Sequence, residues 1–235
     1  MSAISHNLQA VRDKIYAAAN TAARAPENVN LLAVSKTWGA DEVLEAARAG
    51  QRAFGENYEQ EAVAKMAVVK AAQPELALEW HFIGPLQSNK TRSIAEHFDW
   101  VHSIDREKIA RRLSDQRPAE LPSLNVCIQV NISGEDSKSG VSPADVPALA
   151  RAIAAMPHLK LRGLMAIPEP ETNPEKQRIP FAQMKQLFDQ LRAQGIELDT
   201  LSMGMTDDMG AAIAAGATIV RVGTAIFGQR QYHEK

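Results

Sequence analysis

The chain has 235 residues, 45% of them hydrophobic and 23% charged, a balance typical of a globular protein with a sizeable core. Its 26 basic and 28 acidic residues give a net charge of −2, which excludes the strong positive field that favours nucleic acids or membrane surfaces. The N-terminus lacks the pattern of a secretion signal, and no apolar run approaches the roughly 20 residues that span a bilayer. Cys127 is the only cysteine, so an internal disulfide is excluded and a small buried side chain is expected. We therefore expect a cytoplasmic protein.

Apolar periodicity predicts helices and strands that alternate along the whole chain. An amphipathic helix comes first, from Ser5 to Ala23, because its apolar residues recur every three or four positions. Short apolar strands are then expected at 31–36, 52–55, 79–83, 99–102, 124–131, 160–166, 198–202 and 217–221. Helical segments are expected between them, among them 42–49, 57–72, 105–115 and 181–194.

Local signals indicate where several of these segments begin and end. Asp41 is expected to cap the helix over 42–49, and Gly50 is expected to end it. Pro143 is expected at the first position of another helix. The proline-rich stretch from Pro168 to Pro180 is expected to form a loop, and Gly195 should end the helix that follows it.

Eight strand-then-helix units predict parallel strands joined by right-handed crossovers. An open doubly wound sheet and a closed barrel both satisfy this pattern. The open sheet is disfavoured, because no glycine-rich G-x-G-x-x-G turn follows the first strand. We therefore predict one α/β domain over residues 1–235, a single (β/α)8 TIM barrel with an extra N-terminal helix.

Lys36 ends the first apolar strand, where an ammonium group is costly to bury unless it is paired or covalently engaged. Burial favours the neutral amine, which is the form that condenses with a carbonyl group. The functional hypothesis is a Schiff-base lysine. The alternative is a lysine whose side chain extends from the strand end into solvent.

The loops after the seventh and eighth strands lie where barrels often bind phosphate. They offer hydroxyl groups at Ser202 and Thr224, and glycines that let backbone amides approach a ligand at Gly204 and Gly223. Arg221, at the end of the eighth strand, cannot lose its proton and needs an acceptor if it is buried. That acceptor is either a carboxylate such as Asp207 or an atom of a bound cofactor.

Three other residues lie at or near strand ends and have both a structural and a functional interpretation. Asn57 either caps a helix or faces a ligand. His81 is more often a hydrogen-bonded core residue than a catalyst in such a strand. Met165 is either core or a soft contact for an aromatic ring.

Together, a Schiff-base lysine, a phosphate-binding pair of loops and an arginine between them describe a receptor for an aldehyde that carries a phosphate. Pyridoxal 5′-phosphate (PLP) has both groups. The segments that carry this chemistry resemble the pyridoxal phosphate homeostasis protein family over essentially the whole chain: 32–37, 54–58, 80–90, 162–165, 202–205 and 221–228.

The resemblance implies a barrel related to the N-terminal domain of alanine racemase, with the cofactor imine on Lys36. It implies a role in controlling free PLP and supplying it to PLP-dependent apoenzymes, without established turnover. It also implies that Ser202, Gly223 and Thr224 hold the phosphate and that Arg221 faces the pyridine nitrogen. The cofactor ring would be surrounded by Asn57, His81, Met165 and Met203.

Two alternatives remain open at this stage. One is a weak PLP-dependent amino-acid racemase, which would need a second acid/base group on the opposite face of its substrate. The other is a lysine aldolase that forms its imine with the substrate itself. A metal-dependent hydrolase is disfavoured, because the histidines include no H-x-H or H-E-x-x-H spacing. We expect a monomer.

Overall fold

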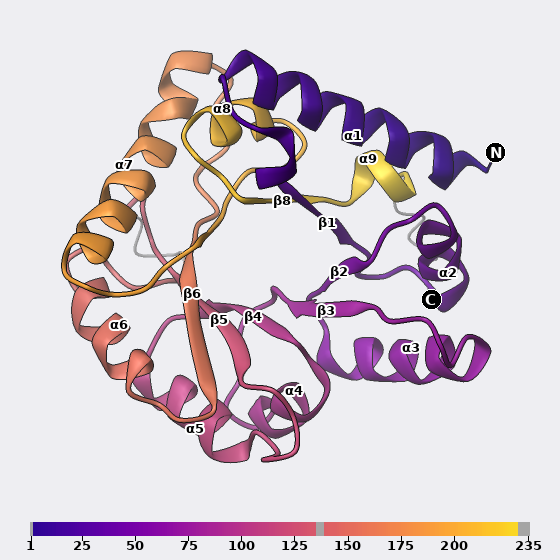
Figure 1. The fold of residues 1–235 in the computed structure, drawn as a ribbon, viewed down its shortest axis with the longest axis horizontal. Coiled ribbons are helices and arrows are strands. Elements are labelled where there is room, and N and C mark those ends of the chain that lie inside the picture. The colour runs from indigo at the N-terminus through magenta and orange to yellow at the C-terminus, as the bar shows by residue number, and fades with distance from the viewer. Residues whose placement is uncertain (1, 135–138, 230–235) are drawn as a thin grey trace.

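Eight parallel strands close into a barrel in the order in which they occur along the chain (Figure 1). The computed structural model describes residues 2–134 and 139–229. Strand β1 pairs with both β2 and β8, which closes the ring and confirms the predicted (β/α)8 barrel. The strands are Asn30–Val34 (β1), Ala53–Glu56 (β2), Glu79–Phe82 (β3), Trp100–Ile104 (β4), Leu124–Gln129 (β5), Leu159–Met165 (β6), Thr200–Ser202 (β7) and Ile219–Val222 (β8).

Helices surround this barrel (Figure 1). They are Ala3–Thr21 (α1), the 3₁₀ turn Pro26–Asn28 (η1), Ala40–Arg48 (α2), Glu59–Ala72 (α3), Thr91–His97 (α4), Glu107–Gln116 (α5), Val146–Ala154 (α6), Pro174–Ala193 (α7), Met209–Ala214 (α8) and Thr224–Phe227 (α9). Within the described residues, none of them is both long enough and apolar enough to cross a bilayer.

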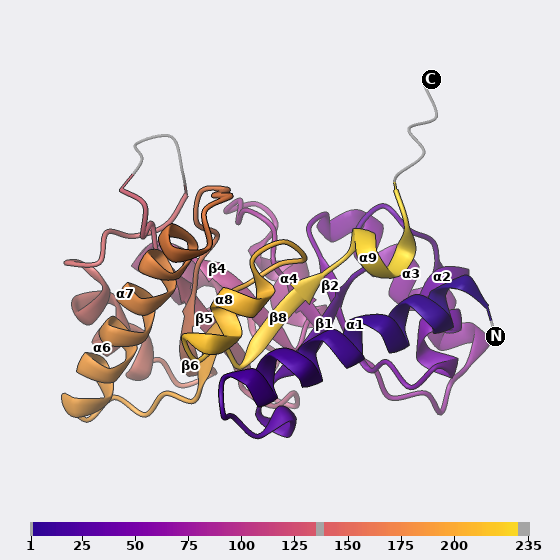
Figure 2. The same cartoon turned by 90° about the horizontal axis from the view of Figure 1, so that it is seen from above.

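The predicted N-terminal helix is confirmed as α1, and it completes the ring of helices beside β8. The helix that follows β8, α9, has only four residues and cannot cover the strand by itself. Helix α1 packs against α8, α9 and α2 and so completes the helical ring on that side (Figure 2). Its buried face includes Leu8, Val11 and Ile15 at helical spacing.

The predicted start of α2 was wrong by two residues. Gly39, not Asp41, is the N-cap, because the Glu42 carboxylate accepts a hydrogen bond from the Gly39 backbone N–H at 2.9 Å. Asp41 lies in the first turn, where its negative charge is favourable for the helix dipole. Gly50 follows the helix with a φ of 87°, which confirms the predicted stop.

Helix α6 does not begin at Pro143. The Asp145 N–H donates to the Ser142 carbonyl at 3.0 Å, and the Ser142 hydroxyl donates to the Asp145 carboxylate at 2.7 Å. These bonds form a turn, so that the helix starts only at Val146. The proline in its first turn is Pro147.

Helix α7 begins seven residues before the predicted Phe181. The Asn173 side chain accepts hydrogen bonds from the N–H groups of Glu175 and Lys176, which caps a helix that starts at Pro174. Pro180 therefore lies inside α7, and the loop predicted up to it ends at residue 173. The predicted end holds, since Gly195 has a φ of 84° directly after the helix.

Strands β6 and β7 approach each other so closely that only glycine fits at position 163. A Cβ atom on Gly163 would lie 1.7 Å from the Thr200 carbonyl oxygen. We expect Gly163→Ala to lower the free energy of unfolding by about 3 kcal/mol, because the strands must separate. Gly210→Ala is the matched control: a Cβ there meets no atom within 4 Å, and alanine should be neutral or stabilising by about 0.5 kcal/mol. Urea unfolding measures both, and equal effects would contradict this account.

Candidate functional site

A pocket of about 300 Å³ opens at the carboxyl ends of the strands. Its lining comes from the ends of β1 and β8 and from the segments that follow β1, β2, β3, β6, β7 and β8, so closure of the barrel creates it. Residues predicted from the sequence that line it are Lys36, Asn57, Arg221, Gly223 and Thr224. The lining residues that were not predicted as site residues are Val34, Trp38, Ile83, Ile167, Met205, Thr206, Asp207 and Gly228.

Lys36 is half-buried in the turn that follows β1. The residue before it is fixed by two buried ionic side chains. The Ser35 hydroxyl donates to Glu56 Oε1 at 2.6 Å, and Lys65 Nζ donates to the Ser35 carbonyl at 2.9 Å and to Glu56 Oε1 at 2.7 Å. Burial raises the pKa of Glu56, and the charge of Lys65 opposes this shift.

The residue after Lys36 is fixed by helix α3, which also carries Lys65. Thr37 has a φ of 69°, which a β-branched residue rarely adopts, and its N–H donates to Glu61 Oε1 at 2.7 Å. Lys65 Nζ lies 3.2 Å from that same oxygen. The Glu56–Lys65–Glu61 cluster therefore holds the backbone on both sides of Lys36.

Arg221 forms a buried wall of the pocket and is only 4% exposed. Its Nη1 donates to Ser202 Oγ at 2.8 Å, and its Nη2 donates to the Ala166 carbonyl at 2.9 Å. Burial lowers the pKa of Arg221 to about 10, and the negative charge of Asp208 opposes the shift. The guanidinium group therefore stays cationic at neutral pH. Its hydrogen-bond acceptors are neutral groups rather than the Asp207 carboxylate considered above.

The turn after β8 provides a tight backbone surface on one side of the pocket. A Cβ atom on Gly223 would lie 3.1 Å from the Val34 carbonyl oxygen, so the small residue permits this close approach. Helix α9 starts at Thr224, and the first amide groups of a helix have no acceptor within the helix. The turn can thus offer a hydroxyl group and backbone N–H groups to an anion.

Asn57 does not cap α3, because the N-cap position is occupied by Tyr58. Its Oδ1 atom is buried and has no hydrogen-bond partner within residues 2–134 and 139–229. A buried amide atom without a partner is costly, and one that lines a pocket is suited to a polar group of a ligand.

The structure places the other four predicted residues outside the lining of this pocket. Ser202 is fully buried, and its hydroxyl bonds to Arg221 and to His102. His81 lines a separate hollow at the amino ends of the strands. Met165 packs with Cys127 and Trp100, and Met203 belongs to the main hydrophobic core.

Cys127 is fully buried, which confirms the expected small buried side chain. Burial raises the pKa of its thiol to about 12, so the thiolate is not formed at neutral pH.

Among the residues that the structure describes, His81 and His102 are buried histidines, and they should make stability depend on pH. Burial lowers the pKa of both below the ordinary value of 6.5. Below that pH the unfolded chain binds protons that the folded chain does not, so stability is complete above pH 6.5 and falls as the pH decreases. We expect a loss of up to about 1.4 kcal/mol per pH unit for each histidine.

Urea unfolding between pH 7.5 and 5.5 measures this loss. The exposed His6 is the matched control, and His6→Asn should keep the same slope. A stability that is constant across this range would contradict the buried, neutral state of the pair.

Comparison with known proteins identifies the family of this chain. The family model of the alanine racemase N-terminal domain matches residues 1–231. The pyridoxal phosphate homeostasis protein of Escherichia coli is 58% identical over 235 residues, which cover 100% of both chains. The protein of that name from Pseudomonas aeruginosa is 59% identical over 232 residues, which cover 99% of this chain and 98% of the other.

Solved structures of two of these kinds of protein share the fold of this chain. PipY of Synechococcus elongatus, with PLP bound, is 37% identical and has a TM-score of 0.81 over 96% of this chain and 100% of its own. Alanine racemase from Corynebacterium glutamicum is 18% identical, and it shares the fold with a TM-score of 0.66 over 99% of this chain and 62% of its own. This chain therefore belongs to the alanine racemase N-terminal domain family and, within it, to the pyridoxal phosphate homeostasis proteins.

Proposed function

We propose that this chain binds PLP in the pocket at the carboxyl ends of the strands, through an imine bond between Lys36 Nζ and the cofactor aldehyde. The observation that carries the proposal is the convergence of Lys36, Arg221 and the Gly223–Thr224 turn on one pocket of about 300 Å³. This volume is at the lower end of the range for small-molecule sites, as a compact cofactor requires. The PLP bound to PipY supports the assignment.

The donors of the pocket fit the groups of PLP. When bound, PLP supplies an aldehyde that condenses reversibly with an amine and a ring that accepts electrons. The Gly223–Thr224 turn would hold the phosphate through its N–H and hydroxyl groups, and Asn57 would face a polar substituent of the ring. Arg221 would donate to the pyridine nitrogen, because its guanidinium group is buried in the pocket wall with further N–H donors available.

We further propose that the protein holds PLP in the cytoplasm and supplies it to PLP-dependent apoenzymes, without catalytic turnover. A guanidinium cation beside the pyridine nitrogen disfavours protonation of that nitrogen, which weakens the ring as an electron acceptor. The half-exposed Lys36 also suits exchange of the cofactor better than protected carbanion chemistry. The names of the relatives from Escherichia coli and Pseudomonas aeruginosa support this role.

A transfer assay tests the proposal. The protein is loaded with PLP, desalted, and mixed with a PLP-dependent apoenzyme in the presence of a phosphatase that destroys free PLP. We expect retained, visibly absorbing PLP and recovery of the apoenzyme's activity. Failure to retain PLP after desalting would refute the binding, and retention without transfer would refute the supply role.

The second candidate, an amino-acid racemase, is tested with the same loaded protein. Chiral chromatography of single L-amino acids should show no D-enantiomer above the level produced by free PLP. Sustained racemisation that is lost in Lys36→Ala would instead establish turnover.

A further inference from the structure

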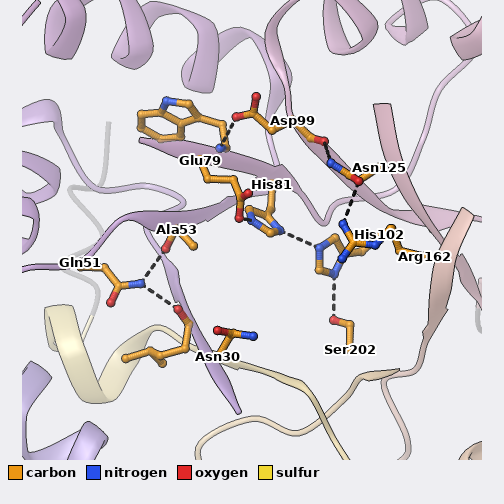
Figure 3. A network of polar contacts seen from close by, with 12 residues as sticks. Asn30, Gln51, Ala53, Glu79, His81, Asp99, His102, Asn125, Arg162 and Ser202 are labelled. Carbon is orange, nitrogen blue, oxygen red and sulfur yellow. Dashed lines mark hydrogen bonds and ion pairs between the residues drawn. The ribbon is translucent and has the colours of Figure 1, made fainter. Parts of the chain in front are cut away.

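A line of hydrogen-bonded polar side chains crosses the inside of the barrel, below the proposed PLP pocket. Arg221 Nη1 bonds to Ser202 Oγ at 2.8 Å, and Ser202 Oγ bonds to His102 Nδ1 at 2.8 Å. His102 Nε2 lies 2.8 Å from His81 Nδ1, and His81 Nε2 lies 2.8 Å from Glu79 Oε1 (Figure 3). His102 is on β4 and Ser202 on β7, which are not neighbouring strands, so they meet only across the barrel interior.

The two ends of this line lie at opposite mouths of the barrel. Arg221 lines the pocket at the carboxyl ends of the strands. Glu79 is at the start of β3, has a half-exposed side chain, and lines a hollow of about 1110 Å³ at the amino ends. The three residues between them are at most 2% exposed, so water does not replace a lost partner.

The chemistry of the ends determines the direction of every hydrogen bond. Glu79 is a carboxylate acceptor, and its bond to His81 lowers its pKa, so His81 carries its proton on Nε2. Neutral His81 then accepts at Nδ1, which requires the proton of His102 to be on Nε2. His102 Nδ1 accepts from the Ser202 hydroxyl, which leaves a lone pair of Ser202 Oγ for the N–H of Arg221.

All four bonds therefore donate in one direction, from the cation Arg221 to the anion Glu79. Successive bonds in such a chain polarise one another and strengthen the whole in a low-dielectric interior. If the group at position 79 were a donor instead, His81 and His102 would each have to move their proton to Nδ1. His102 would then donate to Ser202, and the Ser202 hydroxyl hydrogen would lose its acceptor beside Arg221.

We propose that Glu79, His81 and His102 are positioning residues that fix the orientation of the Ser202 hydroxyl and thereby hold Arg221 toward the cofactor pocket. Whether the side chain at position 79 accepts or donates a hydrogen bond, at the amino-end mouth, thus sets the affinity for PLP at the carboxyl-end mouth. The inference rests on the proposed function for the identity of the ligand, but not for the hydrogen-bond order, which is a property of the ligand-free protein.

The test uses two substitutions of Glu79, which the structure places at the mouth opposite the PLP pocket. Glu79→Gln keeps an acceptor oxygen, whereas Glu79→Lys offers only donors to His81. Glu27→Lys is the matched control, because Glu27 is exposed and lines the same hollow but bonds to none of these residues. Each variant is examined as the full chain.

Long-range ¹H–¹⁵N NMR of the ligand-free protein reports the position of the proton on each imidazole ring. We expect Nε2–H on both His81 and His102 in the wild type, Glu79→Gln and Glu27→Lys. In Glu79→Lys both protons should be on Nδ1. A wild-type histidine with Nδ1–H, or unchanged tautomers in Glu79→Lys, would overturn the proposal.

PLP titration gives the second readout. Glu79→Lys should weaken PLP binding about fivefold to tenfold, the effect of one lost hydrogen bond, while Glu79→Gln and Glu27→Lys stay within about twofold of the wild type. Equal affinity in Glu79→Lys and the wild type, or an equal loss in Glu27→Lys, would refute the coupling. If the wild type itself fails to bind PLP, the proposed function fails, and the tautomers still decide the hydrogen-bond order.

Discussion

Lys36→Ala is expected to abolish both the retention of PLP after desalting and the visible absorption of the imine. The covalent bond is lost, and the hydrogen bonds from the Gly223–Thr224 turn and Arg221 that remain are individually modest. PLP at 100 times its Kd should stabilise the wild type by about 2.7 kcal/mol, and it should not stabilise the variant at that concentration. Absorption spectra and urea unfolding with and without PLP measure both effects.

Lys90→Ala is the matched control for this substitution. Lys90 follows β3 and forms an ion pair with Glu59 at 3.3 Å, and it does not line the pocket. The control should keep the wild-type absorption and stabilisation by PLP. Equal losses in the two variants, or an unchanged spectrum in Lys36→Ala, would show that the amine of Lys36 is not the site.

Arg221→Met is expected to weaken PLP binding by about 10-fold to 100-fold, the range of one charge-assisted hydrogen bond, and to shift the absorption band. Methionine keeps much of the buried volume but removes the cation and every N–H donor. The hydroxyl of Ser202 and the carbonyl of Ala166 then lose their donor. Titration of the desalted variant with PLP gives the affinity and the spectrum together.

Arg221→Lys separates charge from geometry. A lysine keeps the positive charge but cannot donate in the planar fork that reaches Ser202 and Ala166 at once. We expect its affinity and spectrum to lie between those of the wild type and Arg221→Met. Wild-type affinity and an unshifted band in Arg221→Met would contradict a role for this arginine at the cofactor ring.

The barrel was predictable because apolar strands and amphipathic helices alternate at a regular spacing that needs no knowledge of tertiary contacts. The same holds for Lys36 and Arg221, whose cationic side chains end apolar runs at one mouth of a barrel. The wrong predictions concern helix starts, where side-chain hydrogen bonds of nearby residues set a boundary other than the predicted one. The stretch from Pro168 to Pro180 was expected to form a loop, but the Asn173 cap and the apolar face of α7 favour a helix that already starts at Pro174.

The polar interior could not be predicted, because its contacts depend on closure and register. His102 was not predicted as part of any site, and His81 was expected near the cofactor ring. Ser202, the partner of His102, is 100 residues away in the chain, and only the closed barrel brings β4 and β7 together across its interior. The exception is Glu79, which lies two residues before His81 on β3 and therefore on the same face of that strand. A strand histidine gives no signal of this contact in its own sequence neighbourhood.

The Glu56–Lys65–Glu61 cluster was missed for a different reason. Lys65 has the spacing and composition of an ordinary solvated helix residue, yet it is 5% exposed and bonds to the backbone beside Lys36. The buried Glu56 that neutralises it comes from a neighbouring strand. Burial of this kind follows from packing of α3 on the barrel rather than from the helix pattern.

Borohydride reduction of the PLP-loaded protein, followed by peptide mass mapping, tests the central claim most directly. Reduction converts the imine into a stable amine and so marks the nitrogen to which the cofactor was attached. We predict one pyridoxyl group per chain, on the peptide that contains Lys36. Label absent from that peptide and spread over exposed lysines such as Lys14 and Lys70 would contradict the account.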